Sequence, residues 1–259
     1  MAAGGIWLLG CGNMGGALLQ RWCDAGMGPI HVIDPVIDPE PGALPGGVTA
    51  SSEAPDGSPE ILVLAVKPQV WRAAVAGLAA RIGASTLVVS VMAGVTIGDI
   101  AGVFPGCAII RAMPNTPAVI GQGVTGLFSN GGPMVLAAAE AVFSPAGATL
   151  WLDSESDFDA LTAVSGSGPA YVFAFIEALA AAAAAAGLEA GLAERLARAT
   201  VTGAAALAVA DAAPARVLRE RVTSPGGTTA AGLAVLLPRL APLLADTVAA
   251  AAARSRRLG

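Results

Sequence analysis

Apolar and polar positions follow two different patterns along the chain. In the first half, short apolar runs alternate with segments in which apolar residues recur at helical spacing. Runs without polar alternation are typical of parallel strands that are buried on both faces. We therefore expect a parallel sheet covered on both sides by helices, among them Met14–Ala25 and Val70–Ile82. The expected strands are Ile6–Leu9, Ile30–Ile33, Ile61–Val66, Leu87–Val91 and Ala108–Arg111, with Val124–Ser129 and Thr149–Leu152 as edge strands.

The pattern changes near residue 153. From Phe158 onward the apolar positions recur at helical spacing, and alanine is abundant. We expect helices there, the last of them broken near Pro238 and Pro242. The chain is therefore expected to form two domains, residues 1–153 with the sheet and residues 154–259 with helices alone. The expected helices are Phe158–Gly187, Leu192–Asp211, Pro214–Val222 and Thr228–Leu258.

The stretch Ala170–Gly187 is the most membrane-like part of the sequence. Glu177 interrupts it, and much of it is alanine, which is only weakly apolar. We expect a buried bundle helix here in preference to a membrane span. The chain leads into its first strand without a basic segment before an apolar run, which argues against a secretory signal.

Composition narrows the class of protein. The net charge is −5 and only 13% of residues are charged, which argues against nucleic-acid binding. The three cysteines, Cys11, Cys23 and Cys107, are odd in number and widely spaced, so a disulfide framework is not expected. We expect a protein of the reducing cytoplasm.

The segment Gly10-Cys11-Gly12-Asn13-Met14-Gly15 has the spacing of a dinucleotide-binding loop. It follows an apolar strand and opens a helix, the context that gives this spacing its meaning. Gly10 permits a tight turn, Gly12 lets a pyrophosphate approach the backbone, and Gly15 lets helix and strand pack closely. A glycine-rich turn without a ligand is the alternative. The sequence thus predicts an α/β fold, with an N-terminal Rossmann-type, doubly wound parallel sheet followed by an all-α domain.

Asp34 ends the second expected strand, where an acid binds the ribose hydroxyls of NAD. The residues from Pro35 to Glu40 contain no Arg or Lys that could accommodate a 2′-phosphate. We therefore expect NADH to be preferred over NADPH. The alternative is that Asp34 is a turn residue before a proline.

Two isolated bases bear on the chemistry. His31, the only histidine, starts the second strand, away from the carboxyl ends where ligands bind. A hydroxyacid dehydrogenase needs a base for the alcohol proton, usually histidine, whereas an imine can be protonated by solvent. Lys67, the only lysine, follows the third strand at the expected cofactor edge. It could supply a proton or hold a carboxylate, or it is a solvated loop lysine.

Two glycine-rich turns stand in the helical half. The segment 222–229, with Ser224-Pro225-Gly226-Gly227 followed by two threonines, would expose successive backbone N–H groups, which suits a carboxylate. An ordinary interhelical turn with an N-cap is the alternative. The segment Ser165–Tyr171 serves as a helix entry. Its Gly-Ser-Gly lacks the spacing of a hydrolase elbow.

Together these motifs resemble the pyrroline-5-carboxylate reductase family, in the family's order and over nearly the whole chain. The matching segments are Gly10–Gly15 (GCGNMG), Ala65–Pro68 (AVKP), Ser90–Thr96 (SVMAGVT), Arg111–Ala118 (RAMPNTPA), Ser165–Tyr171 (SGSGPAY) and Ser224–Thr229 (SPGGTT).

The resemblance implies a Rossmann domain, a helical dimerisation domain and a homodimer, which can assemble into larger rings. It implies an active site between the cofactor domain and the helical domains of the dimer. Thr229 and Lys67 are the implied catalytic residues. Substrate contacts are implied for Glu155, Ser224, Gly227, Thr228 and Thr229. Cofactor contacts are implied for Leu9, Gly10, Cys11, Gly12, Asn13, Met14, Asp34, Ser52, Ala65, Val66, Lys67, Pro68, Val91, Met92, Ala93 and Asn115.

The resemblance also implies a reaction, hydride transfer from NADH or NADPH to the imine of 1-pyrroline-5-carboxylate to give L-proline. No metal site and no nucleic-acid or membrane partner are expected. Reduction of another cyclic imine acid, such as the six-membered homologue, is an alternative that pocket size would decide. A nucleotide-binding protein without catalysis is a second alternative, against which the intact SPGGTT and RAMPNTP segments argue.

Overall fold

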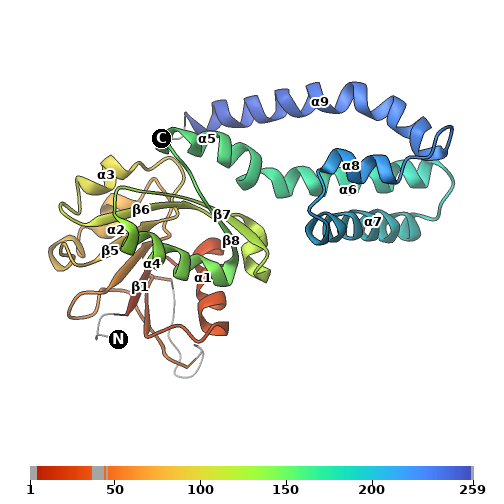
Figure 1. Cartoon of the computed structure of the whole chain (residues 1–259). Coiled ribbons are helices and arrows are strands. Elements are labelled where there is room, and N and C mark those ends of the chain that lie inside the picture. Colours follow the sequence, from red (N-terminus) through yellow and green to blue (C-terminus); the bar gives the residue numbers. More distant parts are fainter. Residues whose placement is uncertain (1–4, 37–43, 45, 258–259) are drawn as a thin grey trace. The chain divides into compact units, whose positions relative to one another are not determined.

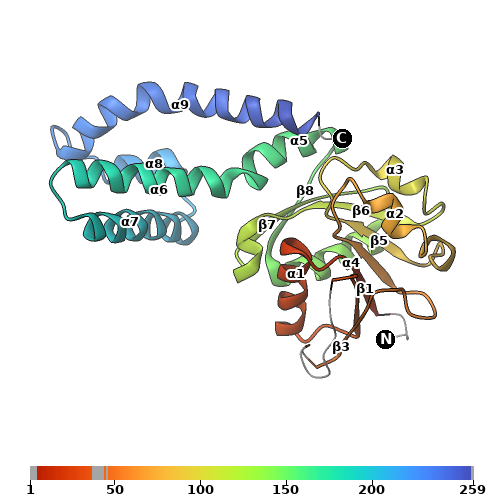
Figure 2. The ribbon, with the colours of Figure 1, turned by 180° about the vertical axis from the view of Figure 1, so that it is seen from behind.

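A computed structural model describes residues 5–36, 44 and 46–257 of the chain. In this part, one sheet has the strand order β3-β2-β1-β4-β5-β6-β7-β8 (Figures 1 and 2). The pairs from β3 through β6 are parallel, β7 runs antiparallel to β6, and β8 is parallel to β7. The order from β3 to β6 is that of a doubly wound dinucleotide fold, so the predicted fold class is confirmed. The strands are β1 Ile6–Leu9, β2 Ile30–Ile33, β3 Val48–Ser51, β4 Ile61–Leu64, β5 Leu87–Ser90, β6 Ala108–Met113, β7 Gly123–Ser129 and β8 Gly147–Trp151.

Helices cover both faces of this sheet because its strands are apolar on both sides. Along β1, Ile6 and Leu8 face one core cluster, and Trp7 and Leu9 face the other. The first cluster includes side chains of α1 (Asn13–Asp24) and α4 (Pro133–Phe143), and the second includes side chains of α2 (Trp71–Val75) and α3 (Ile97–Ala101). Burying each large apolar side chain contributes about 1.5–3 kcal/mol, so the two clusters hold the sheet between its helices.

Several strands end at other residues than expected, because a strand extends only as far as its neighbour can pair with it. β4 ends at Leu64 because its neighbour β1 ends at Leu9, where Gly10 turns the chain with φ +93°. β6 runs on to Met113 because the antiparallel β7 supplies partners that far. The edge strand β3 and the helices α3 and α4 were not predicted.

The expected helix Val70–Ile82 is two short pieces, α2 and a 3₁₀ turn, η1, at Ala79–Arg81. Gly77 lies between them, and a glycine there weakens a helix because its backbone loses more freedom on ordering.

The helical half begins with η4 (Glu155–Asp157), α5 (Phe158–Leu161) and the π-helical turn η5 (Thr162–Gly166). The single helix expected over Phe158–Gly187 is therefore wrong, because η5 and Ser167 separate α5 from the helix that follows. The long helices follow as α6 Gly168–Ala185, α7 Ala190–Ala210, α8 Ala215–Arg221 and α9 Thr228–Ser255.

The expected break in α9 is also wrong. Pro238 and Pro242 both lie inside the continuous helix. A proline removes one backbone donor but has a φ that suits a helix. The loss of two hydrogen bonds, one turn apart, leaves the remaining turns of this 28-residue helix in place.

The chain divides into two compact units, Met1–Gly166 with Ala251–Gly259, and Ser167–Ala250. The domain boundary between residues 153 and 154 stays a prediction. In the second unit only Ala193 and Ala197 are buried, whereas Phe173 is 63% and Val209 90% exposed.

The expectation that Ala170–Gly187 forms a buried helix is thus wrong for the single chain, since none of α6 is buried. By length and composition, the described helical segments Glu155–Ala185 and Thr228–Ser255 could each cross a membrane.

His31 lies in β2 as expected, at the exposed border with β3. Its ring nitrogens lie 2.7 Å from the Thr49 hydroxyl and 2.8 Å from the Ser51 hydroxyl. Partial burial lowers the pKa of His31 from its ordinary value of 6.5. The unfolded chain therefore binds a proton at this residue more readily than the folded chain does.

We predict that stability falls as the pH drops from 6.5 through the lower pKa of folded His31, and that this contribution is complete above pH 6.5. Thermal unfolding of the wild type and His31→Gln at pH values between about 5 and 8 tests this, in a range where most carboxylates stay ionised. The variant should lose the dependence between pH 5 and 6.5. The same slope in both proteins would contradict the prediction.

Candidate active site

One row of paired residues crosses the carboxyl ends of the parallel strands. Leu9 of β1 pairs with Ile33 of β2 and with Leu64 of β4. Leu64 in turn pairs across the sheet with Ser90 of β5, which pairs with Arg111 of β6. The segments after this row therefore leave the sheet side by side, and they hold most of the predicted cofactor contacts. Ligands of such sheets bind at this end, where the strand order reverses, here between β1 and β4.

The glycine loop between β1 and α1 is closed on one side and open on the other. A Cβ at Gly10 would lie 2.9 Å from the Ala65 carbonyl oxygen, and one at Gly15 would collide with the carbonyl oxygen of Gly10. A Cβ at Gly12 would meet no described atom within 4 Å. α1 begins at Asn13 without a side-chain cap on its first N–H groups. An open glycine before uncapped N–H groups fits a pyrophosphate.

Asp34, directly after β2, is bonded to this loop. Its Oδ2 accepts the Cys11 N–H at 2.7 Å, and its Oδ1 accepts the Val36 N–H at 2.9 Å. The carboxylate thus fixes the glycine loop and places negative charge at the end of β2. Burial, and then the Asp34 charge, raise the pKa of the Cys11 thiol, so this thiol stays protonated and weakly nucleophilic near neutral pH.

A cavity of about 270 Å³ adjoins the end of β2. Its lining includes Ile33, Ser52, Ala74 and Arg81. The Arg81 guanidinium donates to backbone carbonyls of the loop after Ser52, those of Ala54 and Pro55. The predicted contact Ser52 thus borders a hollow of mixed polar and apolar lining, which contains the fixed Arg81 cation and adjoins the end of β2.

The loops after β4 and β5 are tied to the sheet by backbone bonds. The Ala65 N–H donates to the Leu9 carbonyl at 2.8 Å, and the Val91 N–H donates to the Leu64 carbonyl at 3.1 Å. Lys67 is exposed on the first of these loops. The Met92 side chain is buried in a core cluster, so its predicted contact with a cofactor would have to come from its backbone.

Asn115, in the turn after β6, has its side chain bonded on both ends. Its Oδ1 accepts the Val124 N–H at 2.9 Å, and its Nδ2 donates to the Ser165 carbonyl at 3.2 Å. This buried amide holds the RAMPNTP turn against β7 and against the SGSGPAY segment. Its predicted place near the nicotinamide stays a prediction.

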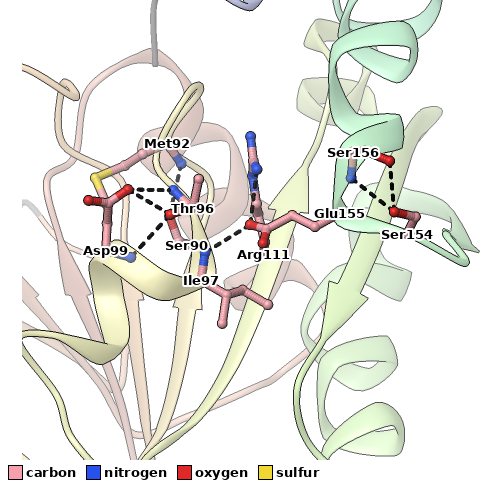
Figure 3. A network of polar contacts seen from close by, with 9 residues as sticks. All are labelled: Ser90, Met92, Thr96, Ile97, Asp99, Arg111, Ser154, Glu155 and Ser156. Atoms are coloured by element: carbon pink, nitrogen blue, oxygen red, sulfur yellow. Dashed lines mark hydrogen bonds and ion pairs between the residues drawn. The ribbon is translucent and has the colours of Figure 1, made fainter.

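Glu155 lies beside β6 and α3 (Figure 3). Its Oε1 accepts from the Arg111 guanidinium at 3.0 Å and from the Ile97 N–H at 2.8 Å. Arg111 is almost fully buried, and its guanidinium lies 4.2 Å from the centre of the Phe158 ring. No role was predicted for Arg111 itself. The signal that could have found it is an arginine in an otherwise apolar strand.

The turn before α9 belongs to the second compact unit. Gly226 has φ +71°, and the Gly227 N–H donates to the Ser224 carbonyl at 3.1 Å, closing the turn. Thr228 and Thr229 follow as the first residues of α9, and both are exposed. The structure therefore presents an exposed helix N-terminus with two hydroxyls at the predicted carboxylate site.

Gly12 and Gly15 of the loop allow a paired prediction. Gly15→Ala should lower the free energy of unfolding by about 1–3 kcal/mol, because its Cβ overlaps backbone. Gly12→Ala should leave the melting temperature unchanged and weaken NADH binding about tenfold or more, since its Cβ projects only into the open side. Thermal melts and NADH fluorescence titrations check both. Unchanged NADH affinity in Gly12→Ala would mean that the pyrophosphate lies elsewhere.

Comparisons with known proteins identify the family of this chain. Residues 155–258 match the family model described as pyrroline-5-carboxylate reductase dimerisation, and residues 5–94 match that of NADP oxidoreductases, coenzyme F420-dependent. The chain is similar to the pyrroline-5-carboxylate reductase of Synechocystis, with 47% identity over 77% of this chain and 75% of the relative. It is 40% identical to that of Arabidopsis thaliana over 82% and 77% of the two chains.

Solved structures give the same family over the full length. A pyrroline-5-carboxylate reductase from Coxiella burnetii has a TM-score of 0.91 and 33% identity, covering 100% of this chain and 99% of that one. The Plasmodium falciparum pyrroline carboxylate reductase with NADP bound has a TM-score of 0.82 and 28% identity, covering 98% and 97%. The chain therefore belongs to the pyrroline-5-carboxylate reductase family, oxidoreductases that transfer a hydride from NAD(P)H to the imine of 1-pyrroline-5-carboxylate and so complete proline biosynthesis.

Proposed function

We propose that this chain reduces 1-pyrroline-5-carboxylate with NADH as its preferred hydride donor. The observation that carries the preference is the Asp34 carboxylate, held at the end of β2 by the Cys11 and Val36 N–H groups. A fixed carboxylate accepts hydrogen bonds from ribose hydroxyls and repels a 2′-phosphate. The Plasmodium relative has NADP bound, so the preference is attributed to Asp34 and not to the fold.

The glycine loop and its neighbours are proposed to hold the dinucleotide. The first N–H groups of α1 would bind the pyrophosphate beside Gly12. The cavity at Ser52 would take the adenosine end. The segments Ala65–Pro68 and Val91–Ala93, both hydrogen-bonded to the sheet, would flank the nicotinamide.

The turn Ser224–Thr229 is proposed to anchor the carboxylate of the substrate. The first N–H groups of α9 and the Thr229 hydroxyl are donors, and a helix N-terminus favours an anion. The bound reduced nicotinamide supplies a hydride to the imine carbon, and the ring nitrogen ends as the amine of proline. Thr229 would hydrogen-bond this nitrogen, and Lys67 is a candidate proton donor or carboxylate partner at the cofactor edge.

Catalysis would then consist mainly of orientation. An imine nitrogen can take its proton from solvent, so the chain needs to fix two rings face to face. Such orientation is worth up to roughly 7–11 kcal/mol in ideal cases. The role proposed for the anchor at Thr229 is to set the register of the imine carbon against the nicotinamide.

The helical half is proposed to form a homodimer. Residues 155–258 match a dimerisation family, and the second unit leaves large apolar side chains exposed, such as Phe173. A hollow of about 630 Å³ between α6 and α7 is lined by Phe173, Ile176 and several alanines, and could receive a helix of the second copy. Burial in a dimer would account for the apolar helices of a cytoplasmic protein. Light scattering would separate a dimer from a larger ring.

The cofactor preference is tested by steady-state assays with pyrroline-5-carboxylate and both cofactors. We expect the wild type to have the higher kcat/KM with NADH. Asp34→Asn, which keeps an acceptor for the loop, should shift the ratio of the two kcat/KM values toward NADPH by about tenfold or more. If the wild type prefers NADPH, the role proposed for Asp34 is refuted, whereas the proposed reaction is not. The six-membered imine acid, assayed in parallel, tests the substrate.

The carboxylate anchor is tested by Thr229→Ala, which should lower kcat/KM for the imine at least about tenfold while leaving the KM for NADH unchanged. Thr247→Ala in the same helix is the matched control, since that hydroxyl donates only to the Leu243 carbonyl one turn back. A kcat/KM within about twofold of wild type for Thr229→Ala would refute the anchor.

A further inference from the structure

The Arg111–Glu155 ion pair joins parts of the chain far apart in sequence (Figure 3). The Arg111 side chain is 8% exposed and the Glu155 side chain 28%, which makes this the most buried of the described ion pairs. The two residues are 44 positions apart. Glu155 opens the segment that leads to the long helices, and Arg111 opens the RAMPNTP motif at the end of β6.

Each partner makes a second contact that fixes its direction. Glu155 also accepts the Ile97 N–H at 2.8 Å, at the start of α3. The guanidinium of Arg111 lies over the ring of Phe158, 4.2 Å from its centre. The pair therefore holds together β6, the start of α3 and the first turns after residue 154.

A second link runs in parallel to the ion pair. Asn115, four residues after Arg111, donates to the Ser165 carbonyl at 3.2 Å. The segment from Glu155 to Ser165 is thus bonded near both of its ends to β6 and the turn that follows. All of these residues belong to the first compact unit.

A buried ion pair of this kind adds little to the free energy of unfolding. Desolvation of two charges offsets most of their attraction, and well-packed apolar residues are often as stabilising. The Nε of Arg111 is buried without a hydrogen-bond partner among the described residues, which adds to the cost. What an ion pair with two fixed partners supplies better than an apolar contact is direction.

The direction matters because of where the bonded segments lie. The N–H that Glu155 accepts, that of Ile97, comes shortly after Val91–Ala93, the proposed nicotinamide contacts. Arg111 leads into the turn that contains Asn115. The pair therefore fixes the end of the loop after β5 against β6, while Asn115 holds the turn after β6.

We propose that Arg111 and Glu155 are a positioning pair for hydride transfer, and that Glu155 acts through Ile97 and Arg111 and not by touching the substrate. The pair holds the loop after β5 at the position relative to β6 that the nicotinamide requires. This inference rests on the proposed function, and it replaces the direct substrate contact that the family resemblance implied for Glu155.

The test begins with Glu155→Gln, which keeps an acceptor for the Ile97 N–H and removes the charge facing Arg111. We expect kcat to fall about tenfold or more, because small misplacements of reacting groups are costly. The KM values for NADH and for the imine should stay within about twofold. The kinetic isotope effect with deuterated NADH should rise, since hydride transfer becomes slower relative to the other steps. Arg111→Lys should keep little of the wild-type kcat, because the lysine ammonium lacks the planar fork of a guanidinium.

Two further variants separate positioning from stability. Arg72→Met on α2 is the matched control, since it breaks the ion pair with Asp99 of α3, in which the two side chains are 61% and 42% exposed. It should leave kcat unchanged. The double variant Arg111→Met/Glu155→Leu should melt close to the wild type and yet remain about tenfold slower. A double variant with the wild-type kcat would overturn the proposal, as would a Glu155→Gln variant that raises only the KM for the imine.

Amide hydrogen exchange gives a readout that does not depend on turnover. Glu155→Ala should raise exchange at residues 91–97 and 155–166 and leave the glycine loop 10–15 protected as in the wild type. Unchanged exchange in the two segments would also overturn the positioning role. A wild type without turnover of pyrroline-5-carboxylate would refute the proposed function, and the exchange measurement would still decide whether the pair orders these loops.

Discussion

The structure depends first on the sharp reversal of the chain between β1 and α1. Gly10 takes up φ +93°, and its carbonyl oxygen lies where a side chain at Gly15 would have to be. Only glycines at both positions let the helix start so close to the strand. The Asp34 carboxylate then ties this reversal to the end of β2. The carboxyl end of the parallel strands thereby presents the uncapped backbone N–H groups of the first turn of α1.

Much of this arrangement was predictable from local patterns. The bounds of β1 and β2 followed from apolar runs that end at glycine or aspartate. The glycine loop followed from spacing, because its geometry needs particular residues at particular positions. The doubly wound order followed from the alternation of strands with helices.

Other features could not be predicted because they depend on distant partners. β3 has intermediate and exposed residues, so its apolar signal is weak. The carboxylate of Glu155 is positioned by Arg111 and Ile97, and no local rule connects these residues. Helix α9 continues through Pro238 and Pro242, although prolines inside a helix predict a break. Bounds that depended on a neighbouring strand, such as the end of β4, were missed for the same reason.

The contrast between the two compact units bears on how the protein is made. The sheet unit closes its own core, with side chains such as Trp22 and Phe104 almost fully buried. The unit from Ser167 to Ala250 buries only two alanines by itself. If a second copy covers these helices, the later part of each nascent chain exposes its apolar side chains until another chain binds it. Maturation then becomes a bimolecular event, and the yield of native protein depends on the local abundance of newly synthesised chains.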